Sequence, residues 1–156
     1  MIYAGQEVGE KGMDAEGFSG KDGRTTIFDW WKVPSLARLH EYIHTGGGLT
    51  EEESQNLRLF RRSLALSCAP AVSEGGTYDL GYCNEGSPGF NPDRHFAFLR
   101  GGGRHNILIV CNFSGDDVNL TVRIPIEAVR YMGIRKTEAF EMNVSVKAGS
   151  YSVLPV

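Results

Sequence analysis

The chain has 156 residues, of which 41% are hydrophobic and 22% are charged, as is usual for a globular protein. Its formal net charge of -3 and the lack of a long basic run argue against nucleic acid or an anionic lipid surface as the main partner. A neutral ligand such as a sugar is compatible with this charge. No apolar run is long enough to cross a bilayer. Cys68, Cys83 and Cys111 form no C-x-x-C pair, so we interpret them as small hydrophobic residues.

The first ten residues change abruptly from apolar to polar. Residues Met1 to Ala4 predict a buried strand, and the glycines and acids after them predict a polar loop. In α/β proteins, loops at the carboxyl ends of parallel strands carry the chemistry. A buried parallel strand needs neighbouring strands and covering helices, and no residues before Met1 supply them. We therefore expect the chain to be the end of a larger protein.

Residues 10–24 combine four glycines with many charged side chains and show no periodicity. This composition predicts a long surface loop, and such loops often bind ligands. The spacing of Asp14, Glu16 and Asp22 does not match a calcium-binding EF-hand loop, so we predict a solvated loop without a metal site. Trp30 and Trp31 follow it; they either stack on sugar rings or anchor the next helix on a core, and we favour the core.

Two helices are predicted next. The first covers residues 34–43, with proline at its start and a run of three glycines, residues 46–48, after its end. The second begins after Thr50, which forms a predicted capping box with Glu53. Its apolar residues recur at helical spacing and define one face to be buried: Leu57, Phe60, Leu64 and Cys68.

After Pro70 the chain alternates short β-prone runs with turns. Residues 73–76 predict a linker, residues 101–104 predict a hairpin turn, and the apolar run 107–110 predicts a central strand covered on both faces. The predicted strands are 77–82, 95–100, 106–113, 118–124, 137–140, 144–146 and 151–154. Short strands at such close spacing indicate an antiparallel sandwich.

Several of these stretches carry a resemblance to a known family. Tyr3-Ala4-Gly5-Gln6-Glu7 resembles the string that ends the eighth barrel strand in the α-amylase family of glycoside hydrolases. The aromatic cluster 26–31, the helices and the chain of short strands follow the order of that family. Asn112-Phe113-Ser114 and residues 150–156 resemble motifs of the β-sandwich that follows its barrel.

The resemblance implies a mainly β fold: an antiparallel β-sandwich of the amylase C-terminal domain type, preceded by a helical remnant of a (β/α)8 barrel. Residues 1–72 would be the remnant of the last strand, loop and helices of the barrel, and residues 73–156 the sandwich. The chain would thus be the C-terminal portion of a larger enzyme. Its localisation stays open, because a signal peptide would precede this portion.

The resemblance also implies what the parent protein does. The parent would be an α-amylase-type glycoside hydrolase of α-linked glucans such as starch and maltooligosaccharides, and this portion would support its catalytic barrel. Retaining hydrolysis uses two carboxyl groups, and the family adds a third Asp; all three come from barrel strands before Met1. We therefore expect no catalytic residue here and no activity of the chain alone. Glu7 and Glu10 are not positions that the family uses as acid or nucleophile.

Asp22 and Arg24 are the candidate substrate-binding residues. In family members with the Tyr-Ala-Gly-Gln-Glu string, the following loop carries an Asp and an Arg that hydrogen-bond glucose units. The family's Asp and Arg are further apart in sequence than Asp22 and Arg24. A carboxylate and a guanidinium can bind adjacent sugar hydroxyls; the alternative is a surface ion pair. No cofactor is implied, and calcium stays open for the parent enzyme.

Other functions and partners remain open. The runner-up is a non-catalytic carbohydrate-binding or interaction module, which exposed, coplanar aromatic side chains such as Tyr78, Tyr82 or Phe90 would favour. The parent could also be a transferase or branching enzyme of the same family. The α-glucan substrate would bind through the parent barrel. Because the apolar face of the second helix needs another cover without the barrel, we expect a homodimer through this face or its repacking on the sandwich.

Overall fold

The computed structural model describes residues 2–11 and 33–156. The chain divides into two compact units, Met1–Ala65 and Leu66–Val156. None of the helices in these described ranges is long and apolar enough to span a membrane.

The first unit contains a short 3-10 helix and two α-helices. These are η1 (Gln6–Val8), α1 (Pro34–Thr45) and α2 (Glu51–Ser67), the last of which runs to the start of the second unit. The first unit has a small buried core, formed by Val8, Leu39 and Leu57. The predicted first helix is confirmed, and it ends at Gly46, whose φ of 78° is easily reached only by glycine.

The N-terminus of α2 has the predicted capping box. The Thr50 N–H donates to Glu53 Oε2 at 2.9 Å, and the Glu53 N–H donates to Thr50 Oγ1 at 3.2 Å. The predicted apolar face is covered only in its first half: Leu57 is buried, Phe60 is half-buried and Leu64 is 45% exposed. The homodimer through this face stays a prediction.

The strand predicted for the first residues is not formed. Ile2 and Tyr3 are exposed, and the chain turns at Gly5 into η1. A strand requires hydrogen bonds from a neighbouring strand, and the described part of the first unit contains no strand that could provide them. The apolar character of this stretch was therefore not sufficient to make a strand.

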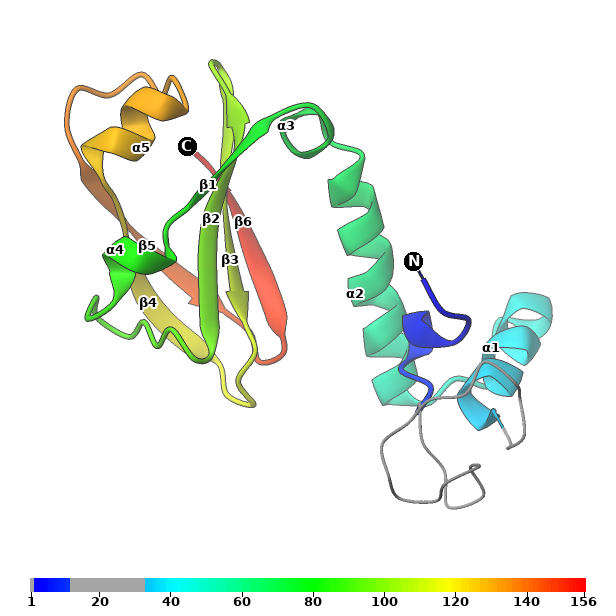
Figure 1. The fold of residues 1–156 in the computed structure, drawn as a ribbon. Helices are drawn as coiled ribbons and strands as arrows, with labels where there is room; N and C mark the ends of the chain where they lie inside the picture. The colour runs from blue at the N-terminus through cyan, green and yellow to red at the C-terminus, as the bar shows by residue number, and fades with distance from the viewer. Residues whose placement is uncertain (1, 12–32) are drawn as a thin grey trace. The chain divides into compact units, whose positions relative to one another are not determined.

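The second unit is an antiparallel sandwich of two sheets (Figure 1). The larger sheet has the order β1-β2-β3-β6, and the smaller sheet pairs β4 with β5. The strands are β1 (Gly76–Asp79), β2 (His95–Gly102), β3 (His105–Asn112), β4 (Val118–Ile124), β5 (Phe140–Val146) and β6 (Ser150–Pro155). The predicted fold class is thereby confirmed in this unit.

The core lies between the two sheets. Leu99 and Leu108 from the larger sheet are fully buried, as are Val122 and Ile124 from the smaller sheet. Ile109, whose side chain points to the opposite face of β3, is also buried. The predicted central position of this strand is confirmed, and Leu108, Ile109 and Val110 are buried.

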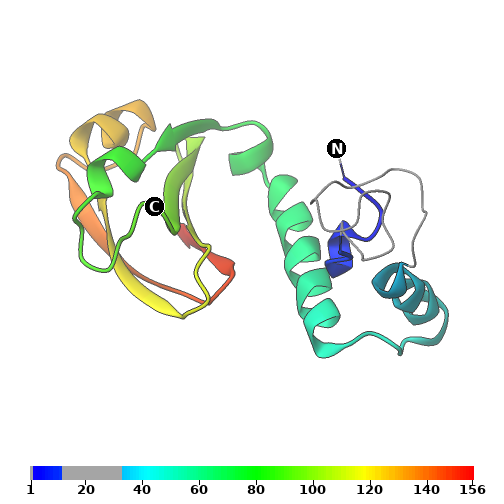
Figure 2. The ribbon, with the colours of Figure 1, turned by 60° about the horizontal axis from the view of Figure 1, so that its bottom comes forward.

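Short helices complete the second unit (Figure 2). They are α3 (Pro70–Ser73), α4 (Gly81–Asn84) and α5 (Ile126–Tyr131). Sequence analysis missed α5 and extended the first strand to Tyr82, two residues into α4. The strand ends at Asp79 because the Asp79 Oδ1 accepts a hydrogen bond from the Gly81 N–H at 2.7 Å, which turns the chain into α4.

Candidate functional site

The predicted substrate-binding residues, Asp22 and Arg24, lie outside the described residues, as do Trp30 and Trp31. Within residues 2–11 and 33–156, no group of three or more His, Cys, Asp and Glu side chains is placed to hold a metal ion. Glu10 has a structural role: its Oε2 accepts a hydrogen bond from the Leu36 N–H at 2.8 Å, in the first turn of α1.

Among the described acids of the first unit, Glu53 has the most strongly shifted pKa. It is almost fully buried, and Arg38 holds it with two donors: Nε at 3.0 Å from Oε2 and Nη2 at 2.6 Å from Oε1. The Arg38 guanidinium lowers the pKa of Glu53 to about 2, against the opposing effect of burial. The pair joins α1 to α2 and so contributes to the packing of the two helices.

Exposed aromatic side chains gather at one edge of the second unit. Tyr78 on β1 lies between Tyr82 on α4 and Tyr131 at the end of α5; we call these three residues the tyrosine patch. The ring centroids are 6.5 Å apart for Tyr78 and Tyr82 and 5.5 Å apart for Tyr78 and Tyr131, and each pair is tilted by 53°. Tyr82 and Tyr131 are 63% and 67% exposed. Phe90, the other aromatic candidate, is buried.

The tyrosine patch is held in place by the fold. Tyr78 is half-buried and packs against the sandwich core. Its hydroxyl and that of Tyr82 are hydrogen-bonded at 2.9 Å. This hydrogen bond is the main reason why the pKa of Tyr82 is raised to about 12, and the negative charge of Glu127 contributes to the same effect. Tyr82 therefore carries a neutral phenol group at physiological pH.

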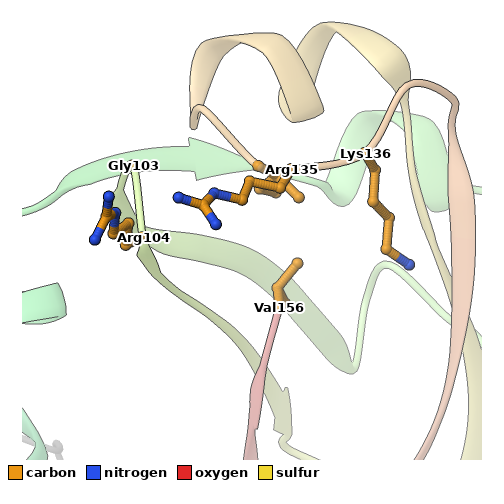
Figure 3. A pocket seen from close by; sticks show the side chains of 6 residues that line it. Gly103, Arg104, Arg135, Lys136 and Val156 are labelled. Atoms are coloured by element: carbon orange, nitrogen blue, oxygen red, sulfur yellow. The ribbon is translucent and has the colours of Figure 1, made fainter.

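A second candidate is a basic hollow of about 240 Å³ at the end of the β2–β3 hairpin. Its charged lining comes from Arg104, Arg135 and Lys136 (Figure 3). The Arg135 side chain extends toward the turn that carries Arg104, whereas Lys136 lies on the other side of Val156. The Lys136 ammonium is 3.6 Å from the centroid of the Phe140 ring, so a cation–π contact already engages it.

The outer face of the larger sheet, which points away from the sandwich core, is apolar. The register places Phe98, Ile109 and Val153 side by side across β2, β3 and β6. Phe96 extends this row; it is exposed, and its ring centroid is 5.2 Å from that of Phe98. An apolar sheet face of this kind is typical of a surface that another protein layer covers.

The Asn-Phe-Ser motif begins at Asn112, the last residue of β3. The Asn112 side chain is buried, and its Nδ2 donates to the Asp116 carbonyl at 2.8 Å and the Lys147 carbonyl at 3.2 Å. Its Oδ1 accepts hydrogen bonds from the N–H and the hydroxyl of Ser114. The motif thus ties the end of β3 to the end of β5, a structural role that sequence analysis did not identify.

The antiparallel sheets of the second unit agree with an all-β domain. Residues 90–153 match the family model described as the alpha amylase C-terminal all-beta domain. Residues 90–153 are therefore similar to the C-terminal all-β domain of α-amylases, and the predicted resemblance to the C-terminal portion of an α-amylase-family protein is confirmed. A comparison with curated proteins found no match.

Proposed function

We propose that this chain is the C-terminal portion of an α-amylase-type glycoside hydrolase that acts on α-linked glucans. Its all-β unit would pack against the catalytic barrel of the parent protein and stabilise it, and the α-glucan substrate would bind in that barrel. The catalytic acid, the nucleophile and the third Asp belong to barrel strands that precede Met1. The chain itself supplies structure and no catalytic carboxylate.

The match over residues 90–153 is the observation that carries this proposal. The apolar outer face of the larger sheet supports it, because Phe96, Phe98 and Val153 would lose their exposure to water on contact with a second layer. Two described acids of the first unit are consistent with a structural role. Glu10 caps a helix, and Glu53 takes part in both a helix cap and an ion pair.

A starch assay tests the proposal. Release of reducing sugar from soluble starch is measured for the parent protein and for the isolated chain. We expect hydrolysis by the parent and none by the chain. Turnover of starch by the chain alone, or a parent protein that does not cleave any α-glucan, would overturn the assignment.

The supporting role has its own test in the parent protein. Val153→Asp places a charge on the outer face of the larger sheet, where contact with the barrel would bury it. Asn143→Asp is the matched control, because Asn143 is exposed on the smaller sheet. We expect faster thermal inactivation of the parent with the first change only. If the two variants are inactivated equally fast, the outer face of the larger sheet does not contact the barrel.

A further inference from the structure

Two exposed histidines, His40 and His44, face each other on α1 in the first unit. We infer that they form a binding site for a divalent transition-metal ion, and that zinc is an ion the site accepts. The proposed function does not use this pair. The inference rests only on residues of the first unit, so it stands or fails independently of the glycoside hydrolase assignment.

The sequence of this turn has a pattern known from zinc-binding helices. It reads His40-Glu41-Tyr42-Ile43-His44, which is H-E-x-x-H. On a helix this spacing places the two histidines one turn apart on one face, where both can bind the same ion. Both lie within the continuous helix α1. Because such a short pattern also occurs by chance, the geometry of the two rings has to carry the argument.

The two imidazole rings are spaced for a shared metal ion. Their Nε2 atoms are 3.3 Å apart, and the ring centroids are 4.6 Å apart with the planes at 65°. Two nitrogen ligands at about 2.0–2.1 Å from a tetrahedral zinc ion lie about 3.3–3.4 Å from each other. The observed separation of the nitrogens is therefore the one that zinc requires. Binding needs little reorganisation of the pair, which lowers its entropic cost.

The contact between the rings also shows how the ion would bind. Two imidazole nitrogens at 3.3 Å share a hydrogen bond, in which one Nε2 carries the hydrogen and the other accepts it. A zinc ion takes the place of this hydrogen and accepts a lone pair from each Nε2. Both neutral rings then carry their hydrogen on Nδ1.

The surroundings determine which ions fit. His44 lies in the last turn of α1, where the negative end of the helix dipole favours a cation. Imidazole nitrogen suits zinc, nickel and copper, whereas calcium and magnesium prefer oxygen ligands. Within the described residues, no third His, Cys, Asp or Glu joins the pair. Water would fill the other positions, so the pair is a binding site and not the three-ligand centre of a zinc hydrolase.

The test is isothermal titration calorimetry of the whole chain, prepared without a histidine tag, with zinc chloride and separately with calcium chloride. The variants are His40→Ala and His44→Ala, at exposed helix positions where alanine favours the helix. His105→Ala is the matched control, because His105 is an exposed histidine on β3 of the other unit. Cys68→Ser is the control for zinc binding by an exposed thiol. Far-ultraviolet circular dichroism verifies that each variant is folded.

We expect one zinc ion per chain and no binding of calcium. Each variant of the pair should bind zinc at least roughly tenfold more weakly, because the second imidazole then no longer adds its effective concentration to the first. Both controls should bind like the unchanged chain. In the unchanged chain, zinc should shift the imidazole NMR signals of His40 and His44 and leave that of His105 in place; this decides the matter if neither variant of the pair folds. Absence of zinc binding, unchanged affinity in both variants of the pair, or loss of binding in either control would overturn the inference.

Discussion

The ion pair between Arg38 and Glu53 gives the sharpest prediction for the first unit. In Glu53→Gln, the side chain keeps its size and can still accept the capping hydrogen bond from the Thr50 N–H, but it loses its charge. A fall of the pKa of Glu53 from 4.5 to about 2 corresponds to about 3 kcal/mol. The Arg38 side chain is 37% exposed, so solvent screens the pair, and we expect a loss of about 1–2 kcal/mol at neutral pH.

The pH dependence of this loss follows from the sign of the shift. Because folding lowers the pKa of Glu53, its contribution is fully present above the unfolded value of 4.5 and disappears as the pH falls toward about 2. Urea unfolding followed by far-ultraviolet circular dichroism measures the difference between Glu53→Gln and the unchanged chain. This difference should shrink as the solution is acidified.

Glu52→Gln is the matched control for the same experiment. Glu52 is the preceding residue of α2 and is exposed, so its charge should contribute little to stability. If the two variants unfold at the same urea concentration at neutral pH, or if the loss in Glu53→Gln is the same at every pH, the assigned role of the ion pair is wrong.

Three further predictions concern the all-β unit. Asn84→Ala removes a buried amide whose Nδ2 and Oδ1 bond a backbone carbonyl and N–H of β4 at 3.0 and 2.7 Å, so urea unfolding should show a loss of about 2–3 kcal/mol. Gly101→Ala places a Cβ 2.0 Å from a backbone oxygen of β3 at a φ of +132° and should cost at least about 2 kcal/mol. Gly102→Ala meets nothing within 4 Å and should change stability by less than about 0.5 kcal/mol. Tyr78→Phe should lower the pKa of Tyr82 from about 12 toward 10, as measured by the absorbance of tyrosinate.

The sequence predicted the parts of the fold that depend on local chemistry. The capping box of Thr50 and Glu53, the glycine that ends α1 and the hairpin between β2 and β3 all appear as expected. The alternation of apolar residues also placed β4 in register with a buried face. These signals are local, because each needs only the residues within one or two turns of the chain.

The features that the sequence did not predict depend on contacts between residues that lie far apart in the sequence. An apolar stretch such as Ile2–Ala4 makes a strand only beside another strand, and the described part of the first unit has none to pair with it. Tyr131 joins the tyrosine patch only because α5 returns to the edge of β1, and α5 itself was missed. The buried role of Asn112 depends on carbonyl groups more than thirty positions away. Periodicity cannot indicate such contacts.

The central claim is that this chain completes an α-amylase-type hydrolase. The most direct measurement is the sequence of the reading frame immediately before the codon for Met1. The account predicts the preceding strand–helix units of a (β/α)8 barrel, with an Asp, a Glu and a second Asp at the ends of their strands. An in-frame stop codon directly before Met1 would contradict it.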